Sequence, residues 1–239
     1  MPENKSKKIG IIGDVHGEDK RLEESLSVLL NEGCQKIVCT GDIVDGVGCP
    51  NRSAKLLQEN KVITVRGNHD RWIIENKARH IKKAHSLHDL TVDTLAFLKK
   101  LPTQATIDLG EIRILVCHGV GDNDLEKIWP GTDRLKALKS ELLDKIISSK
   151  RYNYMINGHI HFRTMIHFRK MTLINAGTIA GDFWPGVSIL DLETNQVHGY
   201  HFKDRKLKPR ISRNLSGKNY TIWENTQSFT GNWDPVRLF

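Results

Sequence analysis

The sequence predicts an α/β fold in which two mixed β-sheets pack on each other within a single domain, as a sandwich flanked by helices. Its first half alternates short apolar runs with segments of helical periodicity, an order typical of a parallel sheet with crossover helices. After Pro102 the chain is richer in short strands with hairpin-like spacing. The 239 residues are enough for one such domain with a sizeable buried core.

The elements of the first half follow from apolar runs and from helical spacing. The run KIGIIG at the start is short and apolar, so it predicts a buried strand. Leu22, Leu26 and Leu29 then recur at helical spacing, and Gly33 ends that helix. The expected order is a strand over 8–13, a helix over 18–32, a strand over 36–40, a helix over 53–58 and a strand over 62–65.

The later elements are read in the same way. Helices are expected near 70–80 and 89–100, and a further amphipathic helix over 133–148. A turn at Gly110 separates two apolar runs that predict paired strands. The strands of the second half are expected over 105–109, 111–117, 152–157, 164–168, 171–175, 186–191 and 196–202.

The formal charge of +8 and the pI of about 9.3 are unevenly distributed along the chain. Residues 203–218 carry seven basic side chains against one acidic one, whereas the first 202 residues hold only +3. We therefore expect a main domain over 1–202 and a basic, aromatic-containing C-terminal extension over 203–239. We expect the aromatic residues of this extension to pack either on the domain over 1–202 or on a second subunit. A homo-oligomer therefore stays one of the alternatives. These aromatics are Tyr220, Trp223, Phe229, Trp233 and Phe239.

Other classes are excluded by simple features. No apolar run approaches the 18 to 20 residues, roughly, that a membrane-spanning helix needs. The polar start over 1–8 lacks the apolar region of a signal peptide, and the four cysteines show no C-x-x-C spacing. We expect reduced thiols, a cytoplasmic protein and no membrane partner.

Five predicted strands end in side chains that can bind a metal. Since the carboxyl ends of parallel strands converge, these side chains are expected at one site, and residues i and i+2 of an extended segment point the same way. Imidazole, carboxylate and amide oxygen together suit Mn, Fe, Zn, Ni or Co. One such cluster alone is more often a turn, but five in succession indicate a metal centre. The clusters are Asp14-x-His16, Gly41-Asp42-x-x-Asp45, Gly67-Asn68-His69-Asp70, His118-Gly119 and Gly158-His159-x-His161.

The order of these five blocks resembles the calcineurin-like metallophosphoesterase superfamily, over residues 9 to 178. The segment Asn175-Ala176-Gly177-Thr178 also looks like the N-P-G-S segment of the small bacterial phosphodiesterases in that superfamily, with Ala for Pro. The resemblance implies a phosphoesterase that hydrolyses a phosphodiester or phosphomonoester by in-line attack of a hydroxide bridging two divalent metal ions. Mn is the metal we expect first, with Fe, Zn, Ni or Co as alternatives.

The resemblance also implies a role for each residue of the blocks. Asp14, His16, Asp42 and His161 would hold one metal, and Asp42, Asn68, His118 and His159 the other, with Asp42 as the bridge. His69 would protonate the leaving oxygen. Asp45 would orient His69, or it only caps loop N–H groups. Asp70 is expected as a helix N-cap, and Arg66 either contacts the substrate phosphate or is a surface arginine.

Several alternatives stay open for the substrate. The segment Gly-Asp14-Val-His16-Gly also resembles Ser/Thr protein phosphatases and dinucleoside polyphosphate hydrolases, but those usually carry Arg-Gly after the second Asp, where this chain has Gly46-Val47. A non-catalytic scaffold is disfavoured, because all the proposed ligand positions hold a competent side chain. Nucleic-acid binding through the extension is possible but not favoured. The loops over 43–52 and 119–132 are expected to select the substrate, and Trp129 could stack on a base.

Overall fold

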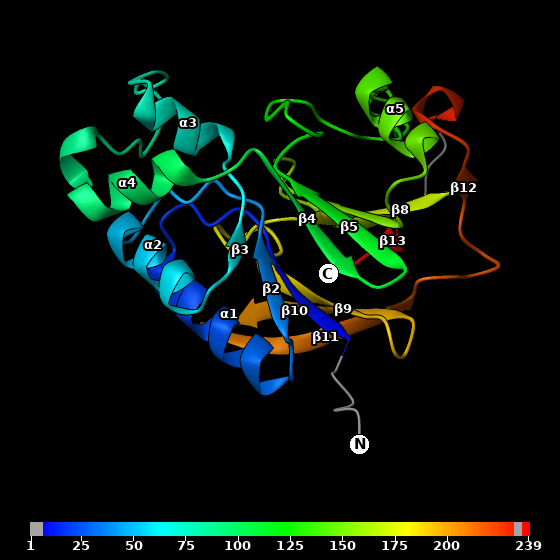
Figure 1. Ribbon diagram of the computed structural model, residues 1–239, viewed down its shortest axis with the longest axis horizontal. Coiled ribbons are helices and arrows are strands. Elements are labelled where there is room, and N and C mark those ends of the chain that lie inside the picture. Colours follow the sequence, from blue (N-terminus) through cyan, green and yellow to red (C-terminus); the bar gives the residue numbers. More distant parts are fainter. Residues whose placement is uncertain (1–6, 232–235) are drawn as a thin grey trace.

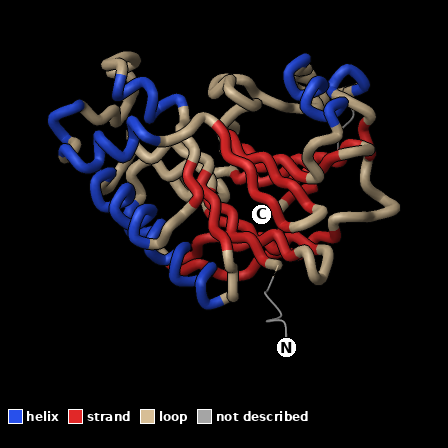
Figure 2. The backbone as a smooth tube through the Cα atoms, in the orientation of Figure 1, coloured by secondary structure: helices blue, strands red, loops and turns tan. Residues whose placement is uncertain are grey.

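The strands of the chain form two mixed sheets, as the sequence predicts. The computed structural model describes residues 7–231 and 236–239. The first sheet has the strand order β11-β10-β9-β1-β2-β3 and the second the order β12-β7-β8-β6-β5-β4, with β13 pairing to β7. Figure 2 shows the strands of both sheets at the centre of the molecule, with the helices outside them.

The first sheet joins the N-terminal strands to strands from the end of the chain. In it, β1 pairs in parallel with β2 and antiparallel with β9. Its strands are β1 (Lys8–Ile12), β2 (Lys36–Cys39), β3 (Ile63–Thr64), β9 (Gly186–Asp191), β10 (Gln196–Lys203) and β11 (Lys206–Asn214). The strands of the second sheet are β4 (Gln104–Leu109), β5 (Ile112–Cys117), β6 (Tyr154–Asn157), β7 (Arg163–Phe168), β8 (Met171–Ala176), β12 (Ile222–Trp223) and β13 (Val236–Arg237).

The helices cover the outer sides of this sandwich. They are α1 (Asp19–Asn31), α2 (Pro50–Glu59), α3 (Asn68–Ile74), α4 (Val92–Lys100) and α5 (Glu141–Ser149). In Figure 1, α1 to α4 lie on the left beside the first sheet, and α5 lies at the upper right over the second. Within the described residues no helix is long and apolar enough to cross a bilayer.

Strand β1 lacks the alternation of apolar and polar residues that a strand with one exposed face shows. Ile9 and Ile11 are buried in the core between the two sheets, whereas Ile12 belongs to the core beneath α1. Gly10 faces the helix, and a Cβ there would come within 2.9 Å of the Leu29 side chain. The strand is therefore buried on both faces, which a run of apolar residues permits.

Two predicted helices are much shorter in the structure than expected. The helix expected near 70–80 ends at Ile74, because Asn76 and Ala78 adopt left-handed backbone conformations. The helix expected over 133–148 begins only after Ser140, whose side chain accepts a hydrogen bond from the Leu143 N–H. Short 3₁₀ turns occur at Leu87–Asp89 and Thr226–Ser228.

Residues 203–239 contribute strands to both sheets. β11 pairs along its length with β10, and β12 and β13 both pair with β7. Trp223, Phe229 and Leu238 are buried in cores that also hold residues of the first 202. Tyr220 stacks on His167, and Phe239 contacts Phe162. Trp233, which was also expected to dock, lies outside the described residues. Most of the basic segment over 203–218 therefore forms β11, the edge strand of the first sheet.

This placement predicts that the C-terminal strands stabilise the domain. Leu238→Ala removes a fully buried side chain, so we expect a loss of about 2–4 kcal/mol in the free energy of unfolding. Ile222→Ala, in the same C-terminal segment but 62% exposed, is the matched control and should change it by less than about 0.5 kcal/mol. Urea denaturation measures both. Equal stabilities of the two variants would show that the segment is dispensable for the fold.

Candidate metal centre

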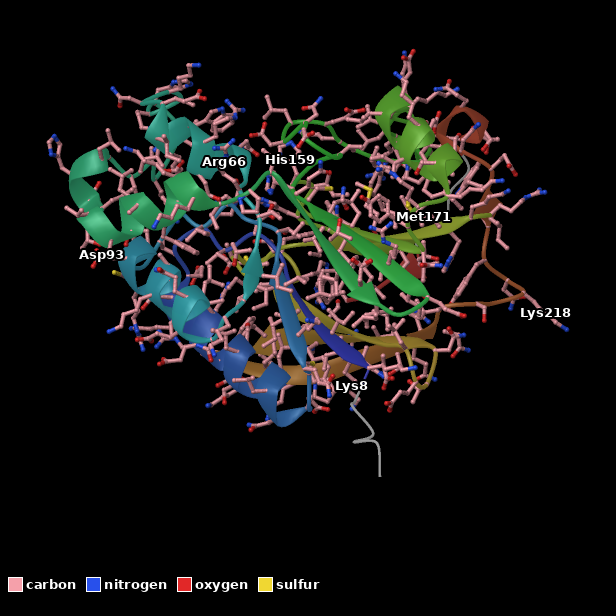
Figure 3. The ribbon with its side chains drawn as sticks, in the orientation of Figure 1. Lys8, Arg66, Asp93, His159, Met171 and Lys218 are labelled. Carbon is pink, nitrogen blue, oxygen red and sulfur yellow. The ribbon has the colours of Figure 1, made fainter. Side chains whose placement is uncertain are left out.

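The five predicted clusters meet at one end of the two sheets. They follow β1, β2 and β3 of the first sheet and β5 and β6 of the second. Figure 3 shows His159 and Arg66 at this end and Lys8, at the start of β1, at the opposite end. The predicted site residues that follow these strands are Asp14, His16, Asp42, Asp45, Arg66, Asn68, His69, His118, His159 and His161.

The two sheets are joined by hydrogen bonds directly at Asp14. Its backbone N–H donates to Gly177 O at 3.0 Å, and its carbonyl accepts from Ile179 N at 3.1 Å and from the Thr178 hydroxyl at 2.7 Å. No side chain fits at Gly13, where a Cβ would lie 2.1 Å from Gly177 O. The segment that resembles N-P-G-S therefore fixes the position of the first carboxylate.

Several site residues adopt a left-handed backbone that L-residues rarely take. Such conformations cost about 1–3 kcal/mol each and persist where the surrounding contacts enforce them, often at functional sites. The φ angles lie between 46° and 68° for His16, Asp42, Asp45, His159 and His161. Together they turn the chain sharply after each strand, so that the side chains converge.

One group of donor atoms gathers around Asp14. The Nε2 atom of His161 lies 3.1 Å from Asp14 Oδ2 and 3.1 Å from His16 Nε2. Metal-ligand atoms of all three residues lie within 4.8 Å of one another. Asp14 is fully buried, and its carboxylate also accepts a hydrogen bond from the His159 N–H at 3.0 Å.

A second group gathers around His118, and Asp42 lies between the two. Asp42 Oδ2 is 3.4 Å from His118 Nε2 and 3.9 Å from His16 Nε2. Asp42, His118 and His159 have ligand atoms within 4.8 Å of one another. The Asn68 amide oxygen lies 2.9 Å from His118 Nε2. The structure therefore brings together all seven residues that the resemblance implied as ligands.

The histidines are oriented for metal binding through Nε2. His16 Nδ1 lies 2.7 Å from the Asp45 carbonyl oxygen, and His118 Nδ1 lies 2.7 Å from the Thr40 carbonyl oxygen. A carbonyl only accepts, so both Nδ1 atoms carry hydrogen, which is the usual outer contact of a metal-binding histidine. The Nε2 atom of His159 is buried and has no hydrogen-bond partner within the described residues.

The electrostatics of the cluster favour added positive charge. Burial alone would lower the pKa of His118, but the carboxylates of Asp42 and Asp14 outweigh it and raise that pKa to about 10. Burial opposes ionisation of Asp42, yet His118, His16 and His69 hold the pKa of its carboxyl well below the ordinary value. Burial and the charge of His118 lower the pKa of His159 to about 4, so its nitrogen is unprotonated at neutral pH. The donor set fits divalent transition metals.

His69 and Asp45 are in direct contact at the edge of this cluster. His69 Nδ1 lies 2.8 Å from Asp45 Oδ2, and His69 Nε2 lies 4.0 Å from Asp42 Oδ2. His69 also has a nitrogen within 4.8 Å of ligand atoms of His16 and Asp42. Asp45 is therefore more than a cap for loop N–H groups, since its carboxylate holds the imidazole.

Sequence reasoning missed the two residues that clamp Asp45. Arg79 donates to both carboxylate oxygens, at 2.8 and 2.9 Å, and the His85 N–H donates to Oδ1 at 2.8 Å. Both residues lie in an irregular segment more than 30 residues after Asp45. No periodicity or motif distinguishes Arg79 from its basic neighbours, so the sequence carried no signal for this contact.

Asp70 and Arg66 occupy positions slightly different from those expected. Gly67, rather than Asp70, is the N-cap of α3; the Asp70 carboxylate accepts from the N–H groups of Gly67 and Ile43, and so ties two of the loops together. Burial and the charge of Asp42 raise the pKa of Asp70 to about 7. Arg66 is half-buried, and its Nε has no hydrogen-bond partner among the described residues.

Comparison with known proteins places this geometry in a family. The model of the calcineurin-like phosphoesterase superfamily domain matches residues 8–195. The uncharacterized protein MJ0912 of Methanocaldococcus jannaschii is 35% identical over 117 residues, which are 46% of this chain and 48% of that protein. The chain thus aligns with about half the length of that relative.

Solved structures share the fold. A metallophosphoesterase from Sphaerobacter thermophilus is similar, with a TM-score of 0.61 and 20% sequence identity. The similar region covers 87% of this chain and 89% of the chain of that metallophosphoesterase. The phosphoesterase Yfce from E. coli is similar with a TM-score of 0.53 and 18% identity, covering 87% and 100%. With 8–195 matched by the family model and candidate ligand groups in place, the chain belongs to the calcineurin-like phosphoesterase superfamily, a family of metal-dependent enzymes that act on phosphoester bonds.

Proposed function

We propose that this protein hydrolyses phosphodiesters or phosphomonoesters at a centre that holds two divalent cations. The observation that carries the proposal is the position of Asp42, whose buried carboxylate lies between the two donor groups. When bound, such a pair of cations activates water and neutralises charge on the phosphate oxygens. We propose Mn²⁺, with Fe, Zn, Ni or Co to be compared. The proposed ligands are Asp14, His16, Asp42 and His161 for one cation, and Asp42, Asn68, His118 and His159 for the other.

His69 is the residue that we propose as proton donor to the leaving oxygen. Burial lowers the pKa of His69, but the hydrogen bond to Asp45 and the charge of Asp42 outweigh it, and the pKa lies above its ordinary value. The raised pKa favours the protonated imidazole, which can supply a proton to an alkoxide. Asp45, held by Arg79, acts as the positioning residue that fixes the ring.

Arg66 is the residue that we propose to contact the substrate phosphate. It follows β3 and lies two residues before Asn68; the residue is half-buried, and its buried Nε has no hydrogen-bond partner in the described part of the chain. A guanidinium can bind two phosphate oxygens at once.

The direct test is a substrate panel with Mn²⁺. Phosphodiesters, phosphomonoesters, dinucleoside polyphosphates and a phosphoprotein are compared, and EDTA should abolish all turnover. We expect esters of the first two kinds to be hydrolysed fastest. Preference for the phosphoprotein or for the polyphosphate would instead favour the two alternative activities of the same superfamily. No turnover with any metal or ester would exclude the enzymatic function.

Asp42→Asn tests the shared ligand. The amide keeps the shape of the side chain but removes its charge, so we expect metal affinity to fall by more than about 100-fold and turnover to be lost. Asp108→Asn, an exposed carboxylate on β4, is the matched control and should behave as the natural chain. Metal content by mass spectrometry and aryl ester hydrolysis give the readout. Two bound cations and normal turnover in Asp42→Asn would refute the ligand assignment.

His69→Ala tests the proton donor separately from metal binding. We expect full metal content and a rate lower by about 10²–10⁴-fold for alkyl esters, with a smaller loss for p-nitrophenyl esters, whose leaving group needs no proton. His198→Ala, on the distant strand β10, is the control. If His69→Ala loses a cation, the residue is a ligand, as its proximity to His16 and Asp42 would allow.

Metal loading should release a proton at neutral pH. Before loading, His118 carries a proton because its pKa is raised to about 10, and a cation must displace it from Nε2. Mn²⁺ affinity is therefore expected to rise by about tenfold per pH unit between pH 6.5 and 8. Calorimetric titrations in two buffers of different ionisation enthalpy count the protons. Affinity that is independent of pH would contradict the charge state of His118.

A further inference from the structure

A pocket of about 530 Å³ opens directly beside two of the proposed metal ligands. Its lining includes His159 and His161, and the loop that follows β5 supplies most of the opposite wall. The volume lies in the range of small-molecule sites. None of the roles assigned above to the metal centre uses this space, so it is available to the part of a substrate that extends away from the reacting phosphate.

The walls of this pocket are apolar and partly aromatic. Phe162 follows His161 directly, is 37% exposed and lies 6.0 Å, ring centre to ring centre, from Trp129. Leu135 and Leu138 line the same space and are 60% and 42% exposed. Apolar side chains that are exposed together beside a polar site indicate a binding site for a ligand or a partner. Because Phe162 also contacts Phe183 and Phe239, its ring is held in place.

The charge at this pocket suits an anion. Lys127 and Lys136 line it, and the residues of its lining include no carboxylate. Lys127 lines the same pocket as the proposed ligand His159, so its charge lies beside the metal centre. A fitting ligand is therefore a molecule that joins a flat apolar group to phosphate.

We propose that this pocket binds the nucleoside part of a nucleotide ester, with the base against Phe162 and the phosphate at the metal centre. The proposal rests on the proposed function and narrows its substrate class. A base fits the observations better than an alkyl chain, because aromatic side chains stack on bases and lysines attract the anionic nucleotide. This space is the Phe162 pocket.

The test measures binding of phosphonates, in which carbon replaces the ester oxygen, so that no turnover interferes. Calorimetry on the Mn²⁺-loaded protein compares the phosphonate analogue of AMP with methylphosphonate and octylphosphonate. We expect the AMP analogue to bind at least about tenfold more tightly than either, as stacking of one base allows. Equal affinity of the AMP analogue and methylphosphonate would overturn the proposal, and tighter binding of octylphosphonate would identify a site for alkyl chains instead.

Variants then locate the effect in the Phe162 pocket. Phe162→Leu keeps an apolar wall but loses the ring, so we expect the AMP analogue to bind about tenfold more weakly and methylphosphonate to bind unchanged. Phe202→Leu makes the same substitution at a half-buried ring on β10 that does not line the pocket, and should change neither affinity. Unchanged binding of the AMP analogue to Phe162→Leu would refute the assignment.

The lysines are tested by their dependence on salt. Lys127→Ala combined with Lys136→Ala should weaken the AMP analogue about threefold at low salt and not at about 0.5 M salt, because exposed charges are screened. Lys145→Ala on α5, away from the pocket, is the control. No weakening at low salt would remove the charge contribution from the proposal.

The two proposals fail in different ways. If methylphosphonate binds and simple aryl esters are hydrolysed, but the AMP analogue gains nothing, only the Phe162 pocket is refuted. If no phosphonate binds and no ester is hydrolysed, the proposed function itself fails.

Discussion

The burial of two carboxylates next to each other is the constraint on which the rest of this structure depends. Asp14 and Asp42 stand at the ends of adjacent parallel strands, and both are almost completely removed from solvent. Buried charges of like sign are costly unless positive charge is supplied nearby. The surrounding imidazoles meet this need in part, which explains the high pKa of His118, and the cations of the proposed centre would supply further positive charge.

The scaffold around these carboxylates works by tying separate loops to one another. Asp70 bonds the N–H groups of the loops after β2 and β3, while Asn175 donates to Gly158 O at 2.7 Å, just before His159. None of these groups is a proposed ligand. They hold the left-handed turns in place, and the candidate ligand positions therefore depend on contacts between separate loops.

Much of the candidate site could be predicted from the sequence, because its candidate ligands stand immediately after strands that apolar runs reveal. The division into two sheets followed from the same runs. The clamp of Arg79 on Asp45 could not be predicted, since it forms across an irregular segment without a pattern. The strand character of 206–214 was also hidden: Pro209 and the dense basic residues argue against a strand, and the pairing becomes possible because β11 lies at the edge of its sheet, beside a bulge at Gly199 and Tyr200.

The basic side chains on the edge strand β11 affect how that edge can pair with other strands. An open sheet edge is a template on which other chains can add strands and aggregate. Pro209 offers no N–H there, and Lys206, Lys208 and Arg210 are exposed along the same strand. The opposite edge, β3, is only two residues long. Both edges of the first sheet are therefore poor sites for strand addition, and the basic side chains that dominate the formal charge lie along one of them.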